Sequence, residues 1–211
     1  ATEEEFAGTE SWNGTNWTEV NDLNTARQLL AGSGTNTSAL AYGGVDYHPS
    51  TVYETKTESW NGTNWTEVAD LNASRYNWQG IGDSNTSALA VAGYTGTANS
   101  GLVELWNGTA WTETTNVSDD GNAYGSAGTA TSALISGGNG RSPNASSEQW
   151  QGPNVPIGAW STGGNMNTAR QMGAYSGIQT AALGYGGNNG PDNLTVTEQY
   201  NGTNWTEMND L

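Results

Sequence analysis

The chain has 211 residues, of which 21 are acidic and 5 basic, giving a formal net charge of −16 at pH 7. A phosphate backbone or an anionic membrane surface would repel such a chain, so we expect no nucleic acid and no membrane insertion. The sequence contains no cysteine, which excludes disulfides, thiolate nucleophiles and cysteine-based metal sites. Its 30 Gly and 10 Trp favour short strands joined by tight turns, and hence an all-β fold.

The first predicted element is a β-hairpin in the half-repeat formed by residues 1–23. The phrase Glu10-Ser11-Trp12 ends one strand, and Trp17 opens the next strand after a four-residue turn. A connection of that length places the two Trp side chains opposite each other on one face of the hairpin. The phrase Glu-x-Trp or Glu-x-Tyr recurs at intervals of 44 to 50 residues, and its later copies end at Trp60, Trp106, Trp150 and Tyr200.

Two further phrases alternate with the hairpin. Leu-Asn-Thr-Ala-Arg at residues 23–27 has relatives at 71–75 and 166–170, and it predicts the start of a first strand. Ser-Ala-Leu-Ala-Tyr-Gly-Gly at 38–44 predicts a second strand ending in two glycines, and its relatives span 87–93, 132–138 and 181–187. Each period therefore holds four short strands. The predicted repeats of this single domain, residues 1–211, are approximately 24–69, 72–115, 116–164 and 167–211.

A four-stranded unit cannot bury its apolar face alone, but units stacked around an axis bury each other's Trp and Leu side chains. The sequence therefore predicts a β-propeller with four full four-stranded blades plus an N-terminal half-blade, in a ring of four to five blades. A linear β-solenoid is the alternative architecture. The half-blade is expected to close the ring within one chain as an incomplete fifth blade. The alternative is that the exposed ends meet a second copy.

The order of these phrases resembles the kelch repeat: Leu-Asn-x-x-Arg, a strand ending in Gly-Gly, Glu-x-Trp/Tyr, and a Trp after the next turn. This resemblance implies a kelch-like β-propeller. The amino-acid sequence of residues 10–20 and 37–44 is also similar to that of repeat proteins of marine bacteriophages, including those that infect cyanobacteria. It implies a place on a virion, in a tail fibre or appendage, or at an extracellular surface. The third repeat departs from the pattern, with Asp119-Asp120-Gly121-Asn122 where Arg is expected.

The repeated polar residues are expected to serve the framework. Arg27, Arg75 and Arg170 share one repeat position, which predicts pairing with a Glu of the blade such as Glu10, Glu58 or Glu198, rather than a ring of cations for an anionic ligand. The recurring Asn-Gly-Thr, a glycosylation-type sequence, is interpreted as a turn that recurs with the hairpin. Asp119–Asn122 lacks the spacing of a known calcium loop.

The sequence argues against an enzyme. A glycosidase needs two unlike carboxylates, whereas the repeated Glu residues occupy equivalent settings. The galactose-oxidase-like activity known for kelch-type propellers requires a crosslinked Cys, which the chain lacks. The lone His48 has no second His or Cys with which to form a metal site or triad. We therefore expect no catalytic residue, no metal and no cofactor.

Binding is expected on one face of the propeller. The connections after the glycine pair, at residues 45–57, 94–103, 139–147 and 188–197, vary in length and sequence, and variable loops on a repeated scaffold usually carry specificity. The candidate ligand-binding residues on that face are Tyr47, His48, Tyr53, Tyr94, Arg141 and Asp192. Exposed Tyr beside Asn and Asp suits a sugar. The sequence thus predicts an adhesion module of a virion appendage or cell surface that recognises a host glycan or surface protein. The alternative is a purely structural element of a phage tail fibre or capsid appendage, with other virion proteins or copies of itself as partners.

Overall fold

The computed structural model describes residues 6–76, 79–141, 143–152 and 158–211. These residues form twenty strands and no helix, which confirms the all-β prediction. The strands make four four-stranded and two two-stranded antiparallel sheets. Their bounds are β1 Thr9–Trp12, β2 Trp17–Val20, β3 Ala31–Thr35, β4 Ser38–Tyr42, β5 Val45–Asp46, β6 Val52–Tyr53, β7 Thr57–Trp60, β8 Trp65–Glu67, β9 Gln79–Ser84, β10 Ser87–Val91, β11 Val103–Trp106, β12 Trp111–Glu113, β13 Gly125–Thr129, β14 Ser132–Ser136, β15 Ser147–Gln151, β16 Ala159–Thr162, β17 Ala174–Ile178, β18 Ala181–Tyr185, β19 Thr197–Tyr200 and β20 Trp205–Glu207.

Each four-stranded sheet contains the strands of one predicted repeat in chain order. The first sheet is β3-β4-β7-β8, the second β9-β10-β11-β12, the third β13-β14-β15-β16 and the fourth β17-β18-β19-β20. The N-terminal hairpin consists of β1 and β2, and a small hairpin of β5 and β6 lies in the connection between β4 and β7. The period of four short strands is therefore confirmed.

The turn between paired Trp residues has the predicted four-residue form. Trp12 lies opposite Trp17 in the register of β1 and β2, with ring centroids 5.5 Å apart. The Asn13 side-chain oxygen accepts hydrogen bonds from the backbone N–H groups of Thr15 and Asn16, both at 2.9 Å. The same pattern recurs at Asn61, Asn107 and Asn201. Asn-Gly-Thr is thus a turn sequence, as expected, in which the Asn side chain satisfies two loop donors.

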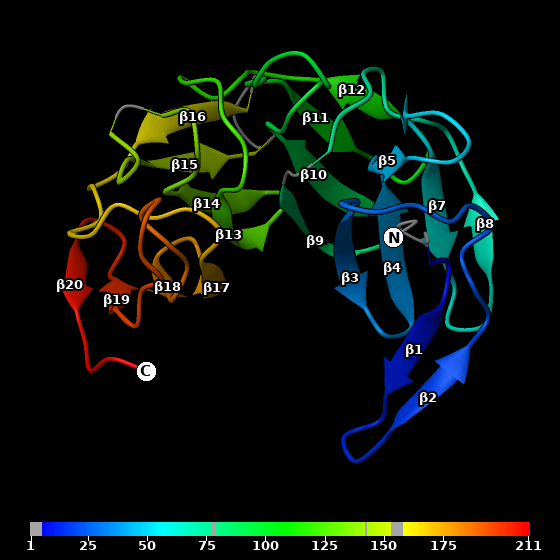
Figure 1. Ribbon diagram of the computed structural model, residues 1–211, viewed down its shortest axis with the longest axis horizontal. Coiled ribbons are helices and arrows are strands. Elements are labelled where there is room, and N and C mark those ends of the chain that lie inside the picture. Colours follow the sequence, from blue (N-terminus) through cyan, green and yellow to red (C-terminus); the bar gives the residue numbers. More distant parts are fainter. Residues whose placement is uncertain (1–5, 77–78, 142, 153–157) are drawn as a thin grey trace.

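The four sheets stand side by side in an arc (Figure 1). Their first strands are neighbours in space: β3 contacts β9, β9 contacts β13, and β13 contacts β17. Close approach of these strands requires small residues, because a Cβ placed on Gly80 of β9 would lie 2.5 Å from the Gly32 carbonyl oxygen of β3. The backbones of neighbouring sheets therefore meet at the inner side of the arc.

The expected closure of the ring within one chain is wrong for the part of the chain that the structure describes. The N-terminal hairpin extends from the first sheet at one end of the arc, and the fourth sheet forms the other end (Figure 1). No strand of the hairpin packs extensively against a described strand of the fourth sheet. A two-stranded hairpin lacks the two inner strands that join neighbouring sheets elsewhere, so it cannot bridge the opening.

The core lies between consecutive sheets. The second strand of one sheet presents its Leu to the paired aromatic residues of the next, so that Leu40 packs in one cluster with Trp106 and Trp111. The predicted burial is confirmed for Trp60, Trp106, Trp150 and Tyr200, which are at most 4% exposed. At the ends of the arc the same positions are open, because no further sheet covers them. Trp12 is 42% exposed and Leu183 is 39% exposed.

Candidate functional site

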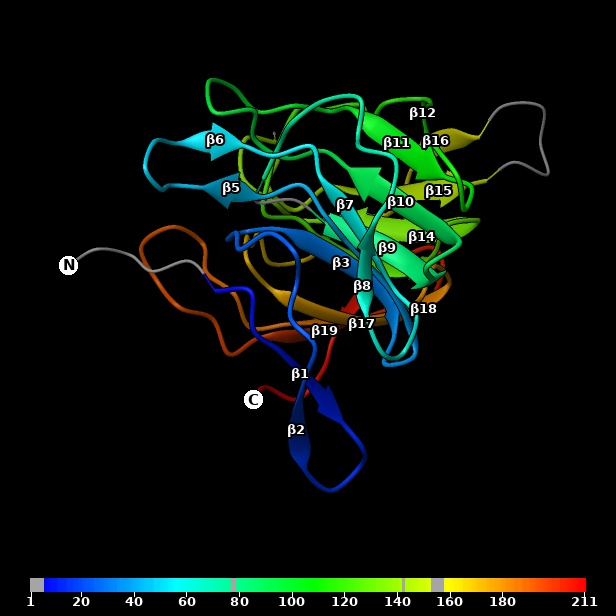
Figure 2. The ribbon, with the colours of Figure 1, turned by 90° about the vertical axis from the view of Figure 1, so that its right-hand side faces the viewer.

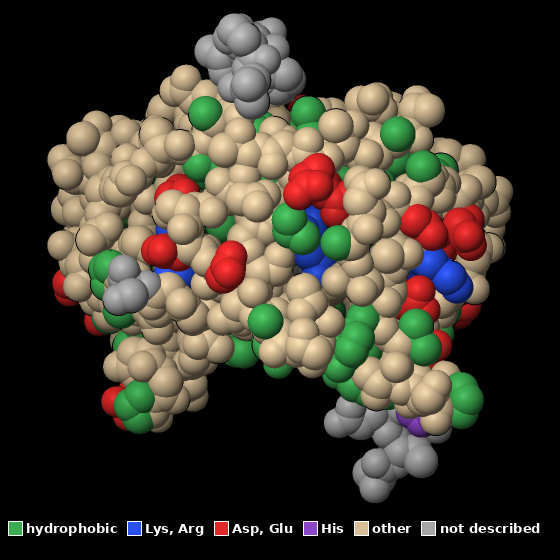
Figure 3. Space-filling view, turned by 90° about the horizontal axis from the view of Figure 1, so that it is seen from above, with side chains coloured by type: hydrophobic (Ala, Val, Ile, Leu, Met, Phe, Trp, Pro, Cys, Tyr) green, Lys and Arg blue, Asp and Glu red, His purple; other side chains and the backbone are tan. Residues whose placement is uncertain are grey.

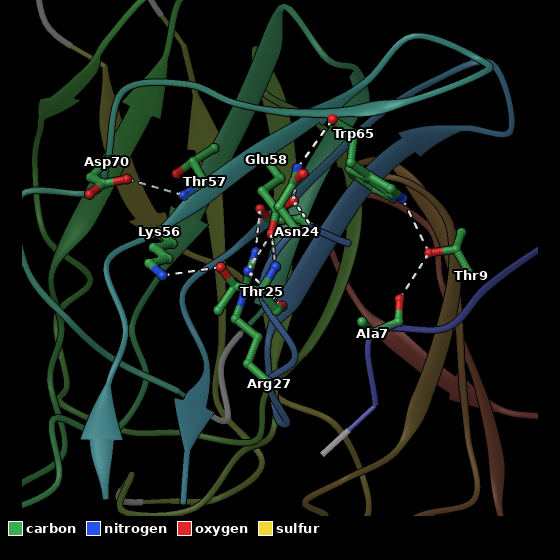
Figure 4. Close-up of polar contacts among 11 residues, drawn as sticks. Ala7, Thr9, Asn24, Thr25, Arg27, Lys56, Thr57, Glu58, Trp65 and Asp70 are labelled. Carbon is green, nitrogen blue, oxygen red and sulfur yellow. Dashed lines mark hydrogen bonds and ion pairs between the residues drawn. The ribbon is translucent and has the colours of Figure 1, made fainter. Parts of the chain in front are cut away.

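A buried carboxylate organises the start of each repeat. In the first sheet, one oxygen of Glu58 accepts hydrogen bonds from the backbone and side-chain nitrogens of Asn24, at 2.7 and 2.8 Å. The other oxygen pairs with Arg27 at 2.6 Å, and both side chains of this pair are fully buried. Figure 4 shows Asn24 and Arg27 converging on Glu58. The arrangement ties the segment before β3 to β7, two strands away in the sheet.

The same cluster recurs in the second and fourth sheets. Glu104 binds Asn72 and Arg75, and Glu198 binds Asn167 and Arg170. The prediction that these arginines belong to the framework is confirmed, because each is at most 2% exposed and paired with a Glu. Glu58 and Glu198 were named as partners, but Glu10 is not one.

Hydrogen bonding controls the ionisation of the buried Glu58. Burial by itself raises the pKa of the Glu58 carboxyl, but the hydrogen bonds from Asn24 and Arg27 together outweigh it and leave the pKa lowered. The carboxylate is therefore charged at neutral pH. All its strong neighbours are donors already engaged in the fold, so it acts as a structural anion and is not placed to transfer a proton to a ligand.

Arg141 is a framework residue and not the exposed ligand-binding residue expected on the loop face. It is 5% exposed and pairs with Glu148. Its guanidinium also lies 5.1 Å from the ring centroid of Tyr124. The third repeat lacks the Arg found before the first strand of the other repeats, and Arg141 supplies the missing cation from the loop after β14. Sequence reasoning missed this substitution because the two arginines occupy different positions in the repeat.

The variable connections do gather on one side. Because the strands of each sheet alternate in direction, the links after its second and fourth strands leave from the same edge. Figure 2 shows the β5–β6 hairpin and the orange segment preceding β19 projecting from the same end of the molecule. The short hairpin turns lie at the opposite ends of the strands. We call this variable side the loop face.

A cluster of tyrosines lies on the loop face where the first and second sheets meet. The rings of Tyr53 and Tyr76 are stacked, with centroids 5.4 Å apart and an interplanar angle of 3°. Tyr94 meets Tyr76 edge-on at 5.6 Å. Burial raises the pKa of the Tyr76 hydroxyl, and the hydroxyls of Tyr47, Tyr53 and Tyr94 raise it further. All four are half-buried, and we refer to them as the tyrosine cluster.

Gly96 fixes the position of Tyr53 in this cluster. A Cβ built on Gly96 would lie 2.1 Å from the Tyr53 ring, and its φ of +94° also favours glycine. The loop after β10 therefore packs directly on an aromatic ring that comes from the loop after β4. The backbones of Tyr76 and Tyr94 exchange two hydrogen bonds, at 3.0 and 2.9 Å. The cluster is thus held rigidly before any ligand arrives.

The structure brings together three of the six candidate residues, Tyr47, Tyr53 and Tyr94, and adds Tyr76. Sequence reasoning missed Tyr76 because it directly follows the framework residue Arg75. The signal was that the corresponding positions vary, with Gln28, Asn122 and Gln171. His48 is exposed in the same connection as Tyr47, and its backbone N–H donates a hydrogen bond to the Asp46 carboxylate at 2.7 Å.

Asp192 lies apart from the tyrosine cluster. It is exposed in the loop of the fourth sheet, where its N–H donates to the Asn189 side chain. Its carboxylate therefore belongs to a different part of the loop face.

Away from the loop face, the few basic side chains at the surface lie next to acidic ones. On the side of the molecule shown in Figure 3, Lys and Arg side chains emerge in small spots beside Asp and Glu. Among the described residues, no group of three or more His, Asp or Glu is placed to hold a metal ion. The described part of the chain also has no helix that could cross a membrane.

Comparison with known proteins identifies the fold and leaves the family open. No protein-family model matches the chain, and no curated protein matches it. Among 171 matching chains of solved structures is one titled "Structure of YjhT". It superposes with a TM-score of 0.78 at 9% identity, covering 97% of this chain and 79% of the other. The chain therefore has a β-propeller-like fold, and at this identity the likeness carries no information about function.

Proposed function

We propose that the chain is a kelch-like β-propeller that binds a ligand and catalyses no reaction. Its four four-stranded sheets would be four blades, and the N-terminal hairpin a half-blade, within one domain of residues 1–211. The repeated order of Arg-bearing segment, glycine-ended strand and paired aromatic residues supports this assignment. The charged residues of that repeat engage one another within the framework, so the loops provide the remaining chemistry.

The tyrosine cluster is the observation that carries the proposal of a binding site. Four half-buried Tyr side chains from three separate connections share one place on the loop face. Rigid aromatic rings offer apolar surface at little entropic cost, and their hydroxyls supply hydrogen bonds. Sugars present the matching combination of C–H faces and hydroxyl groups. The net charge of −16 favours a neutral or amino sugar over an anionic one.

We place this activity on a virion appendage or cell surface, where the ligand would be a host glycan or surface protein. The support is the resemblance of the repeats to those of marine bacteriophage proteins. The strongly acidic composition also suits a protein that must stay soluble while displayed in many copies.

A glycan array tests the proposal. The purified chain should bind a restricted set of neutral or amino-sugar glycans, or a protein extracted from the host surface. Tyr76→Ala should weaken that binding at least about tenfold, and Gln171→Ala, which changes the same repeat position in another sheet, should preserve it. The absence of specific binding to both glycans and host surface proteins would refute the proposed function.

A structural role is the second candidate, and the open ends of the arc favour it. Trp12 and Trp17 at one end, and Ile178 and Leu183 at the other, are between 39% and 63% exposed. Apolar surfaces of this kind commonly mark association sites. A purely structural element of a tail fibre or capsid appendage would use these ends to assemble and would leave the loop face without a ligand. Binding that depends on Tyr76 distinguishes the two functions.

A further inference from the structure

The N-terminal hairpin contains a copy of the framework glutamate. Glu10 pairs with Glu19 in the register of β1 and β2, just as Glu58 pairs with Glu67 and Glu104 with Glu113. Glu58 and Glu104 are buried, and each holds an Asn and an Arg from a preceding segment. Glu10 is exposed, and within the described residues its carboxylate makes no hydrogen bond or ion pair. The hairpin thus carries the acceptor of a framework cluster without the donors.

The edge of β1 is open where the equivalent strands are paired. In the four-stranded sheets, the strand bearing the framework glutamate always pairs with a second strand on its inner side, namely β4, β10, β14 or β18. Among the described residues, β1 pairs only with β2. An open strand edge presents unpaired N–H and C=O groups that can accept another strand.

An apolar groove runs beside this edge. It has a volume of about 290 Å³, and its lining includes Glu10, Ser11 and Trp12 of β1 with Ala39, Trp60 and Trp65 of the first sheet. In the neighbouring interface, the corresponding space above Trp106 and Trp111 is filled by Leu40 of a second strand. The groove therefore has the apolar lining, the strand edge and the anionic group that a pair of inner strands meets elsewhere in the molecule.

The hairpin already sits in the position of a blade relative to the first sheet. The Trp65 indole N–H donates to the Thr9 hydroxyl at 3.1 Å, as that of Trp111 donates to Thr57 at 3.0 Å (Figure 4 shows the Trp65 contact). The Leu23 N–H donates to the Ala7 carbonyl at 3.0 Å, repeating the bond from Leu71 to Thr55. The groove is consequently in register with the rest of the repeat.

We infer that the groove beside β1 binds a two-stranded β-hairpin preceded by an Asn-x-x-Arg segment, with one strand paired to β1 and the arginine on Glu10. Three features select this occupant. The β1 edge can form a strand ladder, the groove can take an apolar side chain, and the two carboxylate oxygens can accept from the Asn and the Arg, as they do in the framework clusters. The bound hairpin completes a fifth four-stranded sheet. The site is distinct from the tyrosine cluster, and the inference does not depend on the proposed function.

The test uses a synthetic peptide of residues 24–44, which contains Asn24, Arg27 and the sequence of both inner strands. It is titrated into the full chain. The peptide has no Trp, so the fluorescence reports on the protein, and burial of Trp12 and Trp17 should shift the emission to shorter wavelength. We expect saturable binding at one peptide per chain.

Three matched changes isolate the arginine contact. Glu10→Gln in the protein and Arg27→Gln in the peptide should each weaken binding about tenfold, the usual loss for a charged hydrogen bond. Glu10 is exposed, so its substitution should leave the fold intact. A peptide of residues 118–138 has the same two strands without an Arg and should also bind more weakly.

The inference is overturned if the 24–44 peptide does not bind, or if its affinity is the same for wild type and Glu10→Gln. Light scattering adds an independent check: a stable mass of twice 22.1 kDa that excludes the peptide would make the groove an interface between copies. If the free peptide aggregates, residues 24–44 are joined after Leu211, which raises the local concentration. That chain should melt at a higher temperature than the original, and Glu10→Gln should remove the gain. An unchanged melting temperature would likewise overturn the inference.

Discussion

Arg141 pairs with Glu148 from seven residues earlier in the chain, whereas Arg27, Arg75 and Arg170 reach their glutamates from 28 to 31 residues earlier. The carboxylate occupies the same position in every repeat, whereas the cation of the third repeat comes from the loop after the second strand and not from the segment before the first strand. This exchange indicates that the fold requires a positive charge at that point and does not require it from a fixed sequence position. A buried carboxylate left unpaired would be costly, which explains why a substitute is present.

Removing the cation of a framework pair should destabilise the protein. Arg75→Met leaves the Glu104 carboxylate buried and unpaired, and the free energy of unfolding should fall by roughly 3–5 kcal/mol. Arg141→Met should have a similar effect. Denaturant unfolding followed by circular dichroism measures both changes. The double variant Arg75→Met with Glu104→Leu should recover part of the loss, and a single variant as stable as wild type would disprove the framework role.

A buried and an exposed Trp at the same repeat position should differ in their contribution to stability. Trp60 is 4% exposed, so Trp60→Ala should lower the free energy of unfolding by roughly 3–5 kcal/mol. Trp12 occupies the same repeat position but is 42% exposed, and Trp12→Ala should cost markedly less. Unfolding midpoints in denaturant compare the two directly. Equal losses would mean that Trp12 is covered in solution.

Alkaline pH should destabilise the fold through its buried tyrosines. Burial raises the pKa of Tyr175 from 10.0 to about 12, and it also raises the pKa values of Tyr42 and Tyr124. Above pH 10 the unfolded chain releases these protons while the folded chain retains them, so the free energy of unfolding falls as pH rises from 10 towards 12.

Tyrosinate absorbance and circular dichroism, followed together, check the alkaline prediction. Loss of structure should accompany the ionisation of the buried group. Tyr42→Phe removes one of these ionisations and should make the pH dependence shallower, although it also loses the hydrogen bond to Leu89. Complete tyrosine ionisation near pH 10 with the fold intact would show that these hydroxyls are accessible.

Gly96 should resist substitution more strongly than a glycine of similar backbone conformation elsewhere. Gly96→Ala places a methyl group against the Tyr53 ring, whereas Gly190, with a φ of +109°, has no atom within 4 Å of the added group. Both variants carry the backbone strain, so the difference isolates the steric term. We expect Gly96→Ala to be about 1–3 kcal/mol less stable than Gly190→Ala, with a changed tyrosine signal in near-ultraviolet circular dichroism. Equal stability of the two variants would show that Gly96 does not pack against the tyrosine cluster.

The repeat made most of the fold predictable. Trp12 opposite Trp17, the glycine-ended strands and the framework arginines followed from phrases that recur in register, because identical local sequences meet identical neighbours. Ring closure was predicted wrongly, since it depends on contacts between the two ends of the chain that no repeat phrase encodes. For the candidate site, the sequence predicted which face of the molecule carries it but not which residues form it. Arg141 was expected on the loop face, but it is buried because it supplies the cation that the third repeat lacks before its first strand. Tyr76 was not predicted, because it directly follows the framework residue Arg75.

The affinity of Tyr76→Ala for a glycan or host protein identified with the wild-type chain tests the central claim most directly. The claim is that the repeated framework supports the fold, while the tyrosine cluster on the loop face binds. The account predicts binding at least about tenfold weaker, a loss of about 1.4 kcal/mol or more, with an unfolding midpoint close to that of Gln171→Ala. Wild-type affinity in Tyr76→Ala, or a loss of binding matched by Gln171→Ala, would contradict it.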